Sequence, residues 1–135
     1  MNDLRRFIYA SRAREGLTEN DAQAIQVHSG RTNALDGITG VLIFTGRHFV
    51  QLIEGAPDAI TDLVIRLERD PRHSRINVLE DERVRDRAFP SWDMLLIPIP
   101  NDRNSASKEI VDHLPGSTSQ DIREKIGKAF ELCFV

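Results

Sequence analysis

The chain contains a single cysteine, Cys133, among 135 residues. One thiol excludes an intramolecular disulfide and a zinc site built from cysteines, and nothing else in the sequence requires an oxidising compartment. The sequence also lacks any run near the ~18 apolar residues of a membrane span, and its first six residues lack the apolar stretch of a signal peptide. We therefore expect a soluble, cytoplasmic protein that binds no membrane.

A surplus of positive charge is missing too. Lys and Arg number 18 against 21 Asp and Glu, which gives a formal net charge of -3. Both signs are interleaved even in the densest charged stretch, residues 66–87, so nucleic-acid binding is not expected. His28, His48 and His73 lack the spacing with carboxylates that builds a metal site, and we predict none.

Hydrophobic residues make up 40% of the chain, which is the composition of an ordinary folded domain. A chain of this length suffices for one domain and is too short for two ordinary ones. It can bury roughly two thirds of its unfolded surface, so a core can form without disulfides or a structural metal. The sequence thus predicts a single folded module.

Hydrophobic periodicity and turn signals indicate the order of the elements. Strands are predicted over residues 4–11, 38–45, 48–54, 76–84 and 91–97. Helices are predicted over residues 18–34, 57–70, 108–114 and 119–132. This order predicts an α+β fold, a ferredoxin-like βαββαβ sandwich with an added fifth strand and a C-terminal helix pair covering the other sheet face. We place a boundary after residue 97, with 98–135 forming a linker and capping helices.

The first predicted helix has an unusual inward stripe. Around Ile25, the residues at helical spacing are small or polar, namely Ala22, His28, Ser29 and Thr32. A helix that packs on a protein core would carry larger aliphatic or aromatic side chains there. Something other than aliphatic side chains is therefore expected to fill that space.

Gln51 lies in a row of apolar side chains on the third strand, between Phe49 and Ile53. A buried amide without partners costs about 1–3 kcal/mol, so this residue needs hydrogen-bond partners. A backbone contact across the sheet is one explanation. Tyr9 on the first strand leaves the same choice between a core residue with a satisfied hydroxyl and a functional one.

Other candidates have ordinary structural explanations when each is taken alone. Asn33 can cap the C-terminus of the first helix, and residues 70–73 can form a solvated charged turn. Trp92 and Met94 stand two apart on one face of the predicted fifth strand, where they can be core residues. Their combination and order favour a different interpretation.

Taken together, these residues resemble the BLUF domain, a blue-light sensor that holds a flavin without a covalent bond. The resemblance spans residues 4 to about 97 and rests on five segments in the family's order. They are Phe7–Tyr9, Ser29–Ala34 with Gly37–Gly40, Phe49–Gly55, Arg66–His73 and Phe89–Met94. As a set they are highly specific.

The resemblance implies that the flavin ring, from FAD or alternatively FMN, lies between the first two helices with its edge toward the sheet. Ile25 and Leu67 would pack on the two ring faces, and Gln51 would bridge Tyr9 and the ring. The implied polar contacts come from Arg31, Thr32, Asn33, Arg66, Asp70, Arg72 and His73. Thr32 departs from the family pattern, in which His or Asn is common, and can offer one hydroxyl.

The activity implied is light sensing without enzymatic turnover. Electron and proton transfer from Tyr9, followed by their return, would leave Gln51 rotated or tautomerised. Trp92 and Met94 on strand five, with the tail helices, are the candidates for passing that change on. The tail resembles the capping helices of short BLUF proteins, so the output would pass to a separate signalling protein. We also expect a homo-oligomer.

Two alternatives stay open at this point. An acylphosphatase-like enzyme shares the ferredoxin-like architecture and uses an Arg and an Asn. Such an enzyme has a Gly-rich loop after the first strand, however, whereas Ser11–Gly16 contains one Gly. The second alternative is a BLUF-derived interaction module that no longer binds flavin. The colour of the purified protein distinguishes the flavin-binding sensor from both alternatives.

Overall fold

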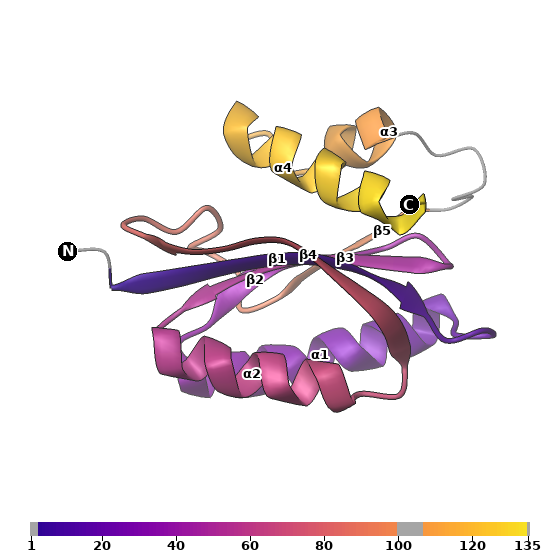
Figure 1. Cartoon of the computed structure of the whole chain (residues 1–135), viewed down its shortest axis with the longest axis horizontal. Coiled ribbons are helices and arrows are strands. Elements are labelled where there is room, and N and C mark those ends of the chain that lie inside the picture. Colours follow the sequence, from indigo (N-terminus) through magenta and orange to yellow (C-terminus); the bar gives the residue numbers. More distant parts are fainter. Residues whose placement is uncertain (1–2, 100–106, 135) are drawn as a thin grey trace.

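The computed structural model describes residues 3–99 and 107–134, and it shows one five-stranded sheet between two helical layers (Figure 1). The strands are β1 (Leu4–Ala13), β2 (Thr39–Phe44), β3 (His48–Gly55), β4 (His73–Val84) and β5 (Leu95–Pro98). Their spatial order is β4-β1-β3-β2-β5, and every neighbouring pair is antiparallel except β2 and β5. The predicted ferredoxin-like sandwich with a fifth strand is confirmed.

The helices divide between the two sheet faces (Figure 1). The helices α1 (Glu19–Asp36) and α2 (Pro57–Arg69) cover one face, which we call the cleft face. On the other face, the capping face, lie α3 (Ser107–Asp112) and α4 (Gln120–Glu131), and a short 3-10 turn, η2 (Leu132–Phe134), follows them. The predicted cover of the second face by a C-terminal helix pair is therefore present.

The ends of the two long helices follow from local chemistry. Thr18 and Asp21 form a capping box at the start of α1, where the sequence predicted the helix to begin. That helix ends at Gly37, whose φ of 69° lies in the left-handed region that glycine adopts without strain. Pro57 occupies the first turn of α2, where its missing N–H would have no partner. These local signals fix where α1 begins and ends and where α2 begins.

The alternation of β3 decides what each sheet face receives. Phe49 and Ile53 pack in the core under α1 and α2, and Gln51 shares their side of the strand. Val50 and Leu52 pack in the other core, under α3 and α4. In the ladder between β1 and β3, Gln51 pairs with Tyr9. Both residues suspected from the sequence are thus side by side on the cleft face.

The fifth strand is shorter than predicted, because it starts at Leu95, where it pairs with Val41 on β2. Trp92 and Met94 therefore precede the strand, and the prediction that they share one of its faces is wrong. Trp92 packs with Phe89 and the core of the capping face, while Met94 packs in the core of the cleft face.

The segment before β5 is irregular because other groups take its carbonyls. Trp92 O accepts from Gly40 N at 3.1 Å, and Met94 O accepts from the Gln26 side chain at 3.2 Å. Gly40 itself lies so close to β3 that a Cβ there would meet Leu52 O at 2.0 Å. None of the helices within residues 3–99 and 107–134 combines the length and apolar character that crossing a membrane requires.

Candidate functional site

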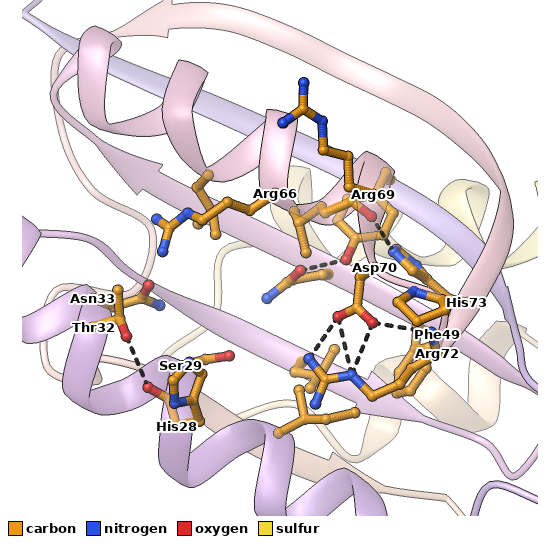
Figure 2. A pocket seen from close by; sticks show the side chains of 17 residues that line it. His28, Ser29, Thr32, Asn33, Phe49, Arg66, Arg69, Asp70, Arg72 and His73 are labelled. Carbon is orange, nitrogen blue, oxygen red and sulfur yellow. Dashed lines mark hydrogen bonds and ion pairs between the residues drawn. The ribbon is translucent and has the colours of Figure 1, made fainter.

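A cleft of about 430 Å³ opens between α1 and α2, with the sheet as its floor (Figure 2). Its volume lies in the range of about 300–1,000 Å³ that is typical of small-molecule sites. The lining side chains come from the sheet, the two helices and the turn after α2. They are Tyr9, Leu42, Phe49, Gln51, Ile25, His28, Ser29, Thr32, Asn33, Leu63, Arg66, Leu67, Arg69, Asp70, Pro71, Arg72 and His73.

Most of the residues predicted from the sequence meet in this cleft. Three do not line it. Arg31 is exposed, because it lies about 100° around α1 from its neighbour Thr32, which does line the cleft. Met94 is buried beside the cleft in contact with Gln51, and Trp92 belongs to the opposite face. The structure therefore places on opposite sheet faces two residues that the sequence predicts on one strand face.

The floor of the cleft carries a buried pair of polar side chains. The Tyr9 hydroxyl donates to Gln51 Oε1 at 2.5 Å, and both side chains are buried. The Gln51 amide nitrogen lies 3.6 Å from Met94 Sδ, so one of its two N–H groups remains for a ligand. Burial raises the pKa of Tyr9 well above its usual value, and the negative charge of Asp70 adds to this. The phenol is therefore neutral and holds its proton.

His73 is held by protein partners on both ring nitrogens. Nε2 lies 2.6 Å from Leu67 O, which can only accept, so Nε2 carries the proton. In the neutral ring Nδ1 then accepts from the Ser11 hydroxyl at 2.7 Å. The ring stands 6.0 Å from the Tyr9 ring, centroid to centroid. His73 thus lines the cleft without a free ring nitrogen, and it can offer a ligand only its face or its C–H edge.

Asn33 lies at the opposite end of the cleft, on the last turns of α1. Its Nδ2 donates to Asp93 O at 3.0 Å, whereas its Oδ1 is buried without a donor among the described residues. A buried acceptor without a donor costs about 1–3 kcal/mol, so this amide is incomplete without a ligand. The neighbouring Thr32 hydroxyl donates instead to His28 O.

A charged turn closes the end of the cleft beyond α2 (Figure 2). The Asp70 carboxylate accepts from Arg72 at the backbone N, Nε and Nη2, at 2.6–3.1 Å. Partial burial acts to raise the pKa of Asp70, but the hydrogen bonds from Arg72 outweigh it and hold that pKa below its usual range. Arg66 and Arg69 project from α2, and Arg66 approaches Asp36 on α1 at 3.8 Å.

Some lining residues were not among the predicted site residues. The polar ones are His28, Ser29 and Arg69. His28 and Ser29 lie three and four residues after Ile25, so the stripe of small or polar residues around Ile25 already indicated them. Arg69 has no comparable signal, because an exposed Arg near the end of a helix is ordinary. Within the described residues no group of three or more His, Cys, Asp or Glu could hold a metal ion.

The sequence profile of the BLUF family, described as sensors of blue-light using FAD, matches residues 4–95. The chain belongs to the BLUF family. By the description of that family, residues 4–95 form a blue-light-sensing domain, and FAD is the cofactor of the family.

Individual relatives support the assignment. Photoactivated adenylate cyclase subunit beta of Euglena gracilis is 31% identical over 123 residues, which cover 90% of this chain and 13% of that protein. The blue light- and temperature-regulated antirepressor BluF of Escherichia coli (strain K12) is 32% identical over 54% of this chain and 18% of its own length. The chain thus spans only a small part of the curated relatives that it matches.

A solved structure of similar size matches nearly end to end. The dark-state structure of BlrB, a BLUF protein, is 30% identical, with a TM-score of 0.72, and covers 96% of this chain and 98% of that one. The fold is thus shared with a BLUF protein over both its sheet and its capping helices.

The cleft fits a flavin on evidence from this chain alone. Its unpaired acceptor, Asn33 Oδ1, needs a donor, and the pyrimidine edge of a flavin carries one N–H between two carbonyls. Gln51 retains an N–H that suits such a carbonyl. Ile25 and Leu67 face the same space from opposite helices and are apolar, as flat ring faces require.

Proposed function

We propose that this chain is a blue-light photoreceptor that holds its flavin non-covalently between α1 and α2 and switches through Tyr9 and Gln51. The observation that carries this proposal is the buried hydrogen bond from the Tyr9 hydroxyl to Gln51 Oε1 on the floor of the cleft. The pair is closed to water, and Gln51 still has an N–H for a ligand. An amide and a phenol that are buried side by side among apolar side chains are more consistent with a functional role than with core packing.

In this proposal the cleft residues divide the work of binding. Ile25 and Leu67 hold the two ring faces, while Asn33 and Gln51 satisfy its polar edge. Asp70, Arg72 and His73 close one end of the cleft through the bonds described above. The side chains of Arg66 and Arg69 extend from α2 at the mouth, where the phosphates of FAD would meet positive charge.

A bound flavin supplies blue-light absorption and, once excited, a strong one-electron oxidant. Tyr9 is the phenol that can give an electron, and its proton has one acceptor in contact, Gln51 Oε1. Rotation or tautomerisation of the Gln51 amide then exchanges the donor and acceptor that it presents to Tyr9 and to the cleft. Met94 Sδ, which contacts the amide nitrogen, is the first neighbour to sense that exchange.

Output then passes to a separate signalling protein, as the sequence analysis expected. The names of the cyclase and antirepressor relatives state that light activates or regulates those proteins, which supports a signalling role for the output. We also propose that the division after residue 97 separates the sensor from its capping helices. A homo-oligomer and a cytoplasmic location stay predictions.

The test is the colour and the photochemistry of the purified chain. It should be yellow, release an oxidised flavin on denaturation, and show a reversible red-shift of flavin absorbance after blue light. Light should also change hydrogen exchange between residues 92 and 130 while α1 and α2 stay protected. A colourless protein that takes up no added FAD would defeat the proposal.

A further inference from the structure

A second polar residue stands in an apolar row of β3, on the face opposite the cleft. Glu54 is 0% exposed and lies on the capping face, in line with Val50 and Leu52. Its carboxylate accepts from Arg6 Nε at 3.0 Å, from Ala88 N at 2.8 and 2.9 Å, and from Phe89 N at 3.2 Å. A fully buried carboxylate is tolerated only with such hydrogen-bond partners. The hydrogen bonds therefore fix the position of the groups that donate them.

The hydrogen bonds to Glu54 anchor the start of residues 88–94, which we call the Met94 segment. Two of its donors are backbone N–H groups of that segment, five and six residues before Met94. The preceding residue, Arg87, is held to the sheet as well, by Thr39 Oγ1 at 2.8 Å and Glu54 O at 3.1 Å. The far end of the segment is bonded on the cleft face, where Met94 contacts Gln51. One short segment thus connects the two faces.

A continuous series of ion pairs runs from Glu54 across the strands of the capping face to α4. Arg6 on β1 pairs with Glu54 and also lies 3.6 Å from Glu80 on β4, between Nη1 and Oε2. The other oxygen of Glu80 contacts Lys125 Nζ on α4 at 2.5 Å. Lys125 in turn lies 3.4 Å from Asp121 on its own helix. Arg6, Glu54 and Glu80 are at most about one tenth exposed as side chains, so water screens these contacts weakly.

The centre of this chain has room for a second arrangement. Arg6 stands between two carboxylates and donates to Glu54 and to Asp86 O, but not to Glu80, whose Oε2 is buried with no hydrogen-bond partner among the described residues. If the N–H groups of Ala88 and Phe89 move toward or away from Glu54, the carboxylate of Glu54 binds Arg6 less or more strongly. Arg6 can then shift toward or away from the unsatisfied oxygen of Glu80, which changes the pairing of Lys125. Alternative pairings of this kind are what a two-state element requires.

We propose that the buried ionic chain Glu54–Arg6–Glu80–Lys125 couples the Met94 segment to α4. In this role Glu54 and Lys125 are positioning residues, since neither lines the flavin cleft. The inference rests on the proposed function for its trigger, the rearrangement of Gln51 beside Met94. It assigns the output of that rearrangement to one helix, and it names the contacts through which the output travels.

The experiment uses the full chain with its flavin bound and compares four proteins. Lys125→Met removes the last charge of the chain but keeps the apolar stem, and Glu80→Gln removes the middle charge at constant shape. Lys128→Met is the matched control, an exposed lysine on the same helix. Each protein, including the wild type, is measured in the dark and under blue light for flavin absorbance and for amide hydrogen exchange in α4.

We expect the same reversible red-shift in all four proteins, because none of the changed side chains lines the cleft. The light–dark difference in α4 exchange should be present in the wild type and in Lys128→Met. It should be lost in Lys125→Met and in Glu80→Gln. A purely structural role for the ionic chain would alter α4 exchange equally in the dark and in the light.

Two results overturn the inference while leaving the photoreceptor intact. One is a wild-type light–dark difference in Lys125→Met, and the other is a red-shift in the wild type with no change of exchange in α4. The absence of a red-shift in the wild type is distinguishable from both. That result removes the proposed function itself, and this inference with it.

Discussion

The helices α1 and α4 lie on opposite faces of one sheet and bury very different surfaces. In α1, 18 residues long, the buried side chains are Ala22 and Asn33. In α4, 12 residues long, the buried residues are Ile122, Ile126, Gly127, Ala129 and Phe130. The shorter helix thus contributes more to a protein core, although both cross the same apolar sheet. The difference supports the proposal that a ligand, rather than protein side chains, fills the space that α1 faces.

The contrast has an energetic side. Each fully buried aliphatic or aromatic side chain contributes about 1.5–3 kcal/mol, so α4 is held by its own residues. With only an alanine and an amide buried, α1 lacks most of that stabilisation. A ligand that binds the folded chain alone supplies it by mass action, by about 2.7 kcal/mol at a hundredfold excess over its Kd. Stability of the cleft face should therefore depend on flavin, and stability of the capping face should not.

The largest expected effect is a complete loss of the light response from one change on the cleft face. Gln51→Leu fills the apolar row between Phe49 and Ile53 at similar size, so the chain should fold and keep its flavin. Leucine has neither donor nor acceptor and cannot take a second hydrogen-bond state. Flavin absorbance before and after blue light should show no persistent red-shift.

Tyr9→Phe provides the companion variant. It keeps the ring and removes the proton and the readily oxidised phenol, so the normal photocycle should also disappear, by a different route. A reversible, wild-type-like red-shift in Gln51→Leu would end the mechanism, whatever Tyr9→Phe shows.

The second prediction sets the two helices against each other. Phe130→Ala removes a fully buried ring from α4 and should lower the free energy of unfolding by about 3–5 kcal/mol, with or without flavin. Ile25→Ala on α1 should leave the flavin-free protein nearly unchanged, because Ile25 is only half-buried there. It should lower flavin affinity instead. Denaturant unfolding with and without added FAD checks both; a large loss of stability in flavin-free Ile25→Ala contradicts the comparison.

A smaller effect distinguishes two neighbours on α1. Asn33→Ala removes a buried acceptor that lacks a protein donor, and it should weaken flavin binding by about tenfold, equivalent to about 1.4 kcal/mol. Thr32→Ala should change affinity less, since its hydroxyl already donates to His28 O. Flavin titration of the two apoproteins measures both. Equal affinity and spectra in Asn33→Ala and wild type would count against this placement.

The sequence predicted the elements well because their signals are local. The capping box at Thr18, the glycine at 37 and the alternation along residues 49–53 each depend on neighbours in the chain. The site was predictable for a related reason, since polar residues in apolar rows are visible without a structure. Gln51 and the stripe around Ile25 both gave that signal, and the cleft contains both.

What the sequence did not predict depends on contacts between distant segments. Alternation could not show that Trp92 and Met94 lie before β5, because that segment is held by Gly40, Gln26 and Asn33 rather than by a ladder. Glu54 is a different case. It stands in an apolar row just as Gln51 does, so the argument that identified Gln51 would also have identified Glu54. Its partners, in contrast, come from β1 and residues 88–89 and have no local signature.

The smallest effects come from two ion pairs at adjacent positions of β4, one on each sheet face. Asp81 bonds Arg5, which also reaches Thr61 on α2, while Glu80 bonds Lys125 on α4. Hydrogen bonds from Arg5 lower the pKa of Asp81, and the hydrogen bond to Glu80 raises the pKa of Lys125. Both pairs should therefore stabilise the fold at neutral pH, and their contributions should be lost at opposite extremes of pH.

The signs follow from linkage between protonation and folding. The contribution of Asp81 is present above its unfolded pKa of about 3.9 and is lost as the pH falls through its lower folded value. The contribution of Lys125 is present below its unfolded pKa of about 10.4 and is lost as the pH rises through its higher folded value. Both groups are partly exposed, so each pair should contribute only about 0.2–1 kcal/mol at neutral pH.

Denaturant unfolding of the wild type, Asp81→Asn and Lys125→Met across the pH range tests this last comparison. Asp81→Asn should differ from the wild type at pH 7 and converge with it in acid. Lys125→Met should differ at pH 7 and converge in alkali. A constant difference from the wild type at every pH would mean that the substitution acts through packing and not through charge. If Lys125→Met shows this constant difference, the ionic chain on the capping face loses its electrostatic basis, while the cleft on the other face is untouched.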